Sequence, residues 1–121
     1  MKRVLIVEDD PVGKVVMQKM LESDFECDIA DSGQQAIHMV SQKHYDGLVL
    51  DINLGDDSID GCQLLSQVRS MNGYQSIPAV ATTAYAMNGD RERFLESGFD
   101  AYVSKPIRVM ELLETVHQVF G

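Results

Sequence analysis

Cysteine, proline and tryptophan are scarce in this sequence. Its 121 residues include two cysteines, three prolines and no tryptophan. Cys27 and Cys62 lie far apart and outside any CxxC pattern, so neither a zinc site nor a redox pair is predicted, and two free thiols suit a reducing compartment. Internal repeats and linkers rich in proline or glycine are also missing, and we expect a single domain over residues 1–121.

Basic charge and long apolar runs are missing as well. Lysine and arginine number 10 against 19 acidic residues, which gives a net charge of −9. This balance argues against direct binding to nucleic acid or an anionic membrane, and it suits a partner with a basic patch or a bound cation. The N-terminal apolar run "VLIV" has only four residues, so we predict no signal peptide or membrane span and expect a cytoplasmic protein without membrane contact.

Short apolar segments alternate with helical patterns along the whole chain. We predict strands at 3–7, 26–30, 46–50, 77–83 and 100–104, and helices at 11–23, around 36–40, around 64–68, at 88–97 and at 109–120. Strands that are apolar throughout and are each followed by a helix predict a parallel sheet covered on both faces. Five such units fit a doubly wound, flavodoxin-like α/β fold, whereas a barrel would need eight.

Charged and hydroxyl side chains gather where the predicted strands end. In such a sheet, ligands bind in a crevice beyond the carboxyl ends of the strands. Four of the strands are followed there by Glu8, Asp9 and Asp10, by Asp51, by Thr82 and Thr83, and by Lys105. We therefore expect these side chains to converge in one crevice.

Three carboxylates packed together would repel one another strongly. A hard divalent cation such as Mg²⁺ relieves this repulsion with oxygen ligands, and Lys105 adds a second positive charge. The alternative is an acidic helix N-terminus, where aspartate favours the helix dipole. That alternative explains "EDD" alone, but it does not explain Asp51 and Lys105 beside it.

An anionic loop after the first strand would repel a free phosphate or a flavin phosphate. Carboxylates, a hydroxyl and a lysine instead suit the transfer of a phosphoryl group onto one of the pocket's own carboxylates, as an acyl phosphate. The cation, Lys105 and the hydroxyl would share the charge of the transition state. Asp51 ends the central strand and is the best candidate acceptor.

Four segments, "VEDDP", "LVLDINL", "AVATTA" and "FDAYVSKP", occur in an order and spacing that resemble a response-regulator receiver domain of two-component signalling. The resemblance covers essentially the whole chain, whether free-standing or attached to a hybrid sensor kinase. It implies a single receiver domain over 1–121 with strand order 2-1-3-4-5. It also implies a phosphorelay switch that catalyses its own phosphorylation and dephosphorylation without being an enzyme in the usual sense. The donor would be a phosphohistidine of a histidine kinase or phosphotransfer protein, and the output a downstream protein effector.

The resemblance also implies a role for each matching residue. Asp51 would be the phosphoacceptor, and Mg²⁺, or Mn²⁺ in its place, would be held by Asp9, Asp51, the backbone carbonyl of Asn53 and, through water, Glu8. Lys105 would be the phosphate-binding lysine, and its peptide bond with Pro106 would be cis. Thr83 and Tyr102 would be the switch residues. Asn53 and Tyr85 would tune the phosphoryl lifetime.

Two adjacent threonines leave a question of register. Neighbouring strand residues point to opposite faces, so only one of Thr82 and Thr83 can face the phosphate. The match of "TTA" to the family's Thr/Ser-Ala pair favours Thr83.

The loop "DINLGDDSIDG" departs from the family pattern, because Gly55 replaces the usual proline and two extra residues precede Asp60. A solvated loop is one interpretation, and altered partner choice or phosphoryl lifetime is the other. The loop also matches the first half of an EF-hand, but Gln67 occupies position 12 and a strand precedes it, so we reject a calcium site.

Two rival functions remain. A pseudo-receiver that serves only as a docking module would lack Asp51, Asp9 or Lys105, and all three are present. An aspartyl-phosphate phosphatase would need a second aspartate two residues after the nucleophile, where Asn53 stands.

Overall fold

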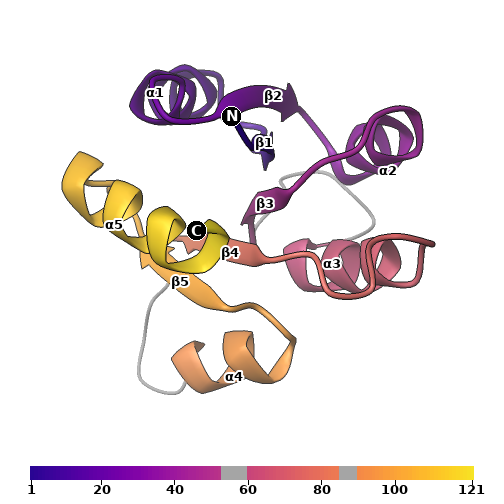
Figure 1. Ribbon diagram of the computed structural model, residues 1–121. Helices are drawn as coiled ribbons and strands as arrows, with labels where there is room; N and C mark the ends of the chain where they lie inside the picture. Colours follow the sequence, from indigo (N-terminus) through magenta and orange to yellow (C-terminus); the bar gives the residue numbers. More distant parts are fainter. Residues whose placement is uncertain (53–59, 85–89) are drawn as a thin grey trace.

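A computed structural model describes residues 1–52, 60–84 and 90–121 (Figure 1). Within these ranges a five-stranded parallel sheet in the order β2-β1-β3-β4-β5 alternates with five helices, which confirms the predicted doubly wound α/β fold and its strand order. The elements are β1 Arg3–Val7, α1 Pro11–Leu21, β2 Glu26–Ala30, α2 Gly33–Gln42, β3 Gly47–Asp51, α3 Gly61–Arg69, β4 Ala79–Thr83, α4 Asp90–Glu96, β5 Ala101–Ser104 and α5 Val109–Phe120.

The sheet divides the core into two halves, because successive strand residues point to opposite faces. Helices α1 and α5 cover one face, and α2 and α3 cover the other, while α4 lies beside β5 (Figure 1). The α1/α5 half of the core contains the strand residues Val4, Ile6, Val49, Val80 and Val103. The α2/α3 half contains Leu5, Val7, Leu48, Leu50, Ala79 and Ala81. The apolar strands are therefore buried on both faces, as a parallel sheet requires.

Several element boundaries differ from those predicted, and two of the differences have a visible cause. The first helix ends at Leu21 rather than near Ser23, because the backbone N–H groups of Asp24 and Phe25 both turn back to the Leu21 carbonyl. The fourth strand begins at Ala79 rather than Ile77, since Pro78 has no N–H to donate to a ladder. The predicted start of the fourth helix at Asn88 lies outside the described residues.

Side-chain caps fix where three helices begin. Asp10 accepts a hydrogen bond from Gly13 N at 2.6 Å, and Ser32 accepts one from Gln35 N at 3.1 Å. Asp60 and Gln63 form a capping box at the start of α3. Such caps satisfy backbone donors that have no partner within the helix.

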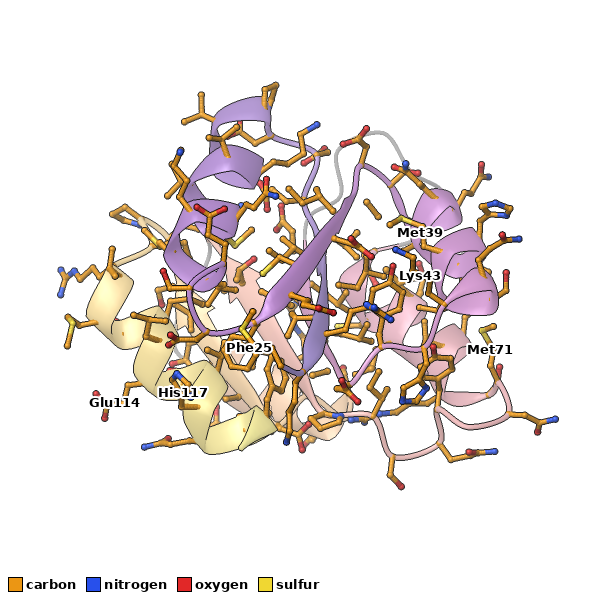
Figure 2. The ribbon with its side chains drawn as sticks, turned by 45° about the horizontal axis from the view of Figure 1, so that its top comes forward. Phe25, Met39, Lys43, Met71, Glu114 and His117 are labelled. Atoms are coloured by element: carbon orange, nitrogen blue, oxygen red, sulfur yellow. The ribbon has the colours of Figure 1, made fainter. Side chains whose placement is uncertain are left out.

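The C-terminal end of α5 is fixed against the turn between α1 and β2. The rings of Phe25 and His117 lie 5.2 Å apart between their centroids, and Figure 2 shows the two side chains together. His117 Nε2 also lies 2.8 Å from Asp24 Oδ2, and Lys2 Nζ donates to the carbonyl of Phe120. This end of the helix is therefore held by ring packing, a polar side-chain contact and a chain-end hydrogen bond.

The thiols of Cys27 and Cys62 are both free, as predicted, and both side chains are partly exposed. Among the described residues, no helix combines the length and apolar character needed to cross a membrane.

Gly61 brings α3 against the carboxyl end of β3. Its N–H donates to the Ile52 carbonyl at 3.1 Å, and a Cβ atom built there would lie 2.6 Å from the backbone oxygen of Asp51. That distance is too short for a real Cβ contact, so only glycine permits this approach beside Asp51.

We expect Gly61→Ala to reduce the free energy of unfolding by about 1–3 kcal/mol, because α3 would have to move away from the Asp51 backbone. Urea denaturation would measure the loss. Ser66→Ala is the matched control, since Ser66 is an exposed residue of the same helix and alanine is well tolerated in helices. Equal stability of Gly61→Ala and the wild type would contradict the close approach.

Candidate functional site

The register of the strands places Glu8 and Asp51 side by side. Val7 pairs with Leu50 between β1 and β3, so the next residues, Glu8 and Asp51, are neighbours at the carboxyl edge. The N–H of Glu8 bonds the Ala30 carbonyl at 3.1 Å and extends the ladder by one residue. By the alternation of strand residues, Glu8 and Asp51 lie on the face of the sheet that carries the α1/α5 half of the core. The acidic residues are therefore adjacent because their strands end at the same level.

Lys105 joins these two carboxylates. Its Nζ donates to both carboxylate oxygens of Glu8 at 3.1 Å and to Asp51 Oδ2 at 3.1 Å. Glu8 is 1% exposed and Asp51 is 3% exposed, so both charges are withdrawn from water. A buried charge is tolerated only when it is paired and hydrogen-bonded, and the three N–H donors of one ammonium meet that need here.

The pKa of Glu8 is raised to about 7, chiefly by burial and next by the charge of Asp51, while the hydrogen bond and charge of Lys105 oppose this shift. Burial acts to lower the pKa of Lys105, but its hydrogen bond to Glu8 and the charge of Asp51 outweigh that effect and raise it. The site thus keeps its ammonium charged and holds Glu8 ready to exchange a proton near neutrality.

A third carboxylate completes a set of oxygen ligands. Ligand atoms of Glu8, Asp9 and Asp51 all lie within 4.8 Å of one another. Such a set fits a hard divalent cation, which prefers carboxylate oxygens and retains waters. Asp9 is half-buried at the edge of the cluster, whereas Asp10 is exposed and caps α1.

Gly13 provides space beside this cluster, which sequence reasoning missed. A Cβ atom at Gly13 would lie 3.0 Å from Glu8 Oε1 and 3.2 Å from Asp10 Oδ2. No spacing or composition in a single sequence points to this role, because it depends on how α1 folds back over the end of β1.

The two threonines of β4 lie on opposite faces, as the alternation predicts. Thr82 pairs with Asp51 on one side and Val103 on the other, which places it in the row that faces α1 and α5. Thr83 pairs with Ser104 and lies on the same face as Tyr102, whose backbone partner is Ala81. Both threonines are fully buried, and Thr82 Oγ1 has no hydrogen-bond partner among the described residues.

The remaining predicted residues divide into two groups. The peptide bond between Lys105 and Pro106 is cis, and the Lys105 N–H donates to the Thr83 carbonyl at 2.7 Å. Asn53 and Tyr85 lie outside the described residues, as does the unusual part of the loop from Gly55 to Ser58.

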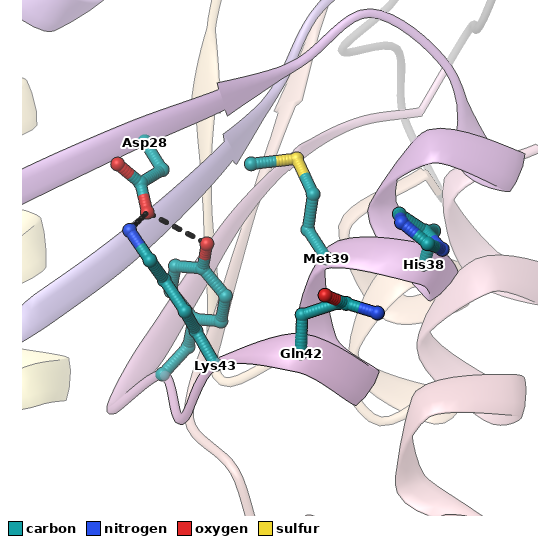
Figure 3. Close-up of a pocket in the computed structure, with 6 residues that line it drawn as sticks. Asp28, His38, Met39, Gln42 and Lys43 are labelled. Carbon is teal, nitrogen blue, oxygen red and sulfur yellow. Dashed lines mark hydrogen bonds and ion pairs between the residues drawn. The ribbon is translucent and has the colours of Figure 1, made fainter.

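A hollow of about 300 Å³ between β2 and α2 lies away from this cluster (Figure 3). Its carboxylate, Asp28, accepts a hydrogen bond from Tyr45 Oη at 2.7 Å and pairs with Lys43 Nζ at 3.4 Å. Because Asp28, Lys43 and Tyr45 of this hollow bond one another, we place the chemistry at the carboxyl edge of the sheet.

Known proteins resemble this chain along almost its whole length. A family model described as the response regulator receiver domain matches residues 4–117. The polar-differentiation response regulator DivK of Brucella ovis is 33% identical over 121 residues, which cover 99% of this chain and 97% of that protein.

Solved structures also superpose closely on this chain. The receiver domain of the sensor histidine kinase PA1611 from Pseudomonas aeruginosa PAO1 was crystallised with a magnesium ion in its active-site cleft. It superposes on this chain with a TM-score of 0.87 at 30% identity, over 99% of this chain and 98% of that one. The Vibrio cholerae chemotaxis protein CheY4 gives a TM-score of 0.89 at 21% identity over 98% of both chains, which shows the shared fold.

The raised pKa of Glu8 predicts that Mg²⁺ binds more weakly in acid. Below about pH 7 the cation must displace a proton from Glu8, so we expect the apparent affinity to fall by a factor approaching ~10 per pH unit. Isothermal titration calorimetry at several pH values would measure this slope. Glu8→Gln should bind Mg²⁺ more weakly and with a smaller slope, and an unchanged slope would assign the proton to another group.

The same shift has a consequence for stability without metal. A pKa raised in the folded state means that folding takes up a proton between about pH 4.5 and 7. The contribution of Glu8 to the free energy of unfolding is therefore fully present below about pH 4.5 and is lost as the pH rises through about 7. Chemical denaturation of wild type and Glu8→Gln across this range should show the difference.

Proposed function

Since this chain belongs to the family of response regulator receiver domains of two-component signalling, we propose that residues 1–121 form one receiver domain in which Asp51 accepts a phosphoryl group. The observation that carries the proposal is the Lys105 ammonium that bridges Glu8 and Asp51 at 3.1 Å, next to the third carboxylate of Asp9. Receiver domains are signalling domains, so this function is a switch rather than the turnover of a separate substrate.

Asp51 acts as the nucleophile. Lys105 Nζ donates a hydrogen bond to Asp51 Oδ2, and one carboxylate oxygen of the buried Asp51 attacks phosphorus. The phosphorus–nitrogen bond of a phosphohistidine on a histidine kinase or phosphotransfer protein breaks, and its electron pair returns to the imidazole. A Mg²⁺ ion held by Asp9, Asp51, the Asn53 carbonyl and, through water, Glu8 would neutralise charge on the transferred group, and Mn²⁺ would substitute. The ammonium of Lys105 then follows the negative charge to the phosphoryl oxygens.

Thr83 and Tyr102 convert this charge into a change of surface. The phosphoryl group carries nearly two negative charges, and we propose that it draws the Thr83 hydroxyl and that Tyr102 turns inward on the same face. Tyr102 lines a groove of about 440 Å³ between α4, β5 and α5, together with Leu95 and Glu111. Movement of Tyr102 would therefore reshape the groove that a downstream protein effector contacts.

The donor has an apolar surface to bind beside the site. Helix α1 begins directly after Glu8, Asp9 and Asp10, and it exposes Val12 at 70%, Val15 at 52% and Val16 at 38%. These three valines follow helical spacing along one side of α1. A protein that presents phosphohistidine to Asp51 must approach this edge of the sheet, and the valines would contact it.

The negative charge fits the same role. A net charge of −9 does not suit direct contact with nucleic acid, so we propose that output passes through protein contact in the cytoplasm. Asn53 and Tyr85 would tune how fast water removes the phosphoryl group.

We expect acetyl phosphate to label the wild type in a Mg²⁺-dependent reaction and to leave Asp51→Asn unlabelled, because an amide cannot form the acyl phosphate. Intact-mass spectrometry would detect the added phosphoryl group. Asp60→Asn is the matched control, since asparagine also caps a helix and labelling should be unchanged. A wild type that takes up no phosphoryl group would favour the phosphorylation-independent docking module instead.

We expect Thr83→Val to be labelled on Asp51 while losing the change at β5, because valine keeps the shape of threonine and lacks the hydroxyl. Amide hydrogen exchange of residues 101–104 with and without phosphorylation would report the change, and Thr83→Ser should restore it. A full response in Thr83→Val would remove Thr83 from the switch.

A further inference from the structure

Thr82 carries a buried hydroxyl without a partner. Its side chain is 0% exposed, and Oγ1 has no hydrogen-bond partner in the described part of the chain. A buried hydroxyl that makes no hydrogen bond destabilises a protein, whereas valine would fill the same volume without that penalty. A hydroxyl kept at this position is therefore explained by a second state of the site in which it is bonded.

The sheet limits what that partner can be. Thr82 lies between Asp51 on β3 and Val103 on β5, both about 4.8 Å away in the ladder direction. Val103 offers no polar atom, so the carboxyl group of Asp51 is the polar neighbour on this row. Rotation about the Cα–Cβ bond of Thr82 is enough to turn its O–H toward that group.

Lys105 explains why the bond is absent in this state. Because β4 separates β5 from β3, the lysine side chain must pass over β4 to place Nζ 3.1 Å from Asp51 Oδ2. Lys105 is two residues beyond Val103, the partner of Thr82, and so its side chain starts on the same face. The Lys105 ammonium already donates a hydrogen bond to Asp51 Oδ2 from the side of β4, where the Thr82 hydroxyl would also approach.

We propose that the Thr82 hydroxyl donates a hydrogen bond to the Asp51 carboxyl group once Lys105 has turned to the phosphoryl oxygens, and that this bond shortens the life of the phosphorylated form. The inference rests on the proposed phosphorylation of Asp51. It assigns a second hydroxyl to the site, on the opposite side of β4 from Thr83.

The direction of the effect follows from the hydrolysis step. Water attacks phosphorus, the bond between phosphorus and the Asp51 oxygen breaks, and its electron pair stays on Asp51 as a carboxylate. The attacking water loses a proton to solvent, and inorganic phosphate leaves. A hydrogen bond to a forming carboxylate is stronger than one to a neutral acyl oxygen, so the Thr82 hydroxyl stabilises the transition state more than the phosphorylated ground state.

The test compares Thr82→Val, which has the same shape without the hydroxyl, with Thr82→Ser, which keeps the hydroxyl. All proteins are phosphorylated with acetyl phosphate and Mg²⁺, the donor is removed, and the decay of the phosphorylated mass is followed. We expect Thr82→Val to lengthen the half-life roughly three- to tenfold and Thr82→Ser to restore it to near the wild-type value. Thr82→Ala, also without the hydroxyl, should follow Thr82→Val.

Thermal denaturation separates this role from packing. In the unphosphorylated state, Thr82→Val should melt about 3–6 °C higher than the wild type, because it removes an unbonded buried hydroxyl. A lower melting temperature would mean that the hydroxyl is already bonded, and it would overturn the inference. An unchanged decay rate in Thr82→Val would also overturn the inference about Thr82, but it would leave the proposed phosphorylation of Asp51 intact. A wild type that is never labelled would instead reject the proposed function, and this inference with it.

Discussion

One ammonium group makes the buried acidic cluster stable. Glu8 and Asp51 are withdrawn from water at the ends of adjacent strands, and Lys105 donates to both at 3.1 Å. Without it, two buried carboxylates would repel each other and take up protons. The ammonium offsets the repulsion within the cluster that we propose to hold a metal ion and a nucleophile.

The alternation of strand residues then separates two tasks. Glu8, Asp51 and Thr82 lie on the row that faces α1 and α5, and the side chain of Lys105 begins on the same face. Thr83 and Tyr102 lie on the opposite face, and Tyr102 lines the groove bounded by α4, β5 and α5. Two consecutive residues of β4 therefore face opposite sides of the sheet beside the acidic cluster.

Much of this arrangement could be predicted from the sequence, because apolar strands and the charged residues that follow them are local patterns. Asp51 and Lys105 were predictable since each comes at a strand end. The Thr82 hydroxyl, which has no partner among the described residues, and the close approach of Gly13 to Glu8 were not predictable, because each depends on register or on helix packing that no local pattern encodes. The predicted roles of Asn53 and Tyr85 stay predictions.

The two ends of α5 are attached to the rest of the protein in different ways. Its C-terminal turn is held by the Phe25 and His117 rings and by Lys2, whereas its N-terminal turn begins with the exposed Val109 and Met110. This N-terminal turn of α5 starts only a few residues after Lys105. A displacement of the lysine backbone would thus reach α5 first at its N-terminal turn, next to the groove, and last at the chain terminus.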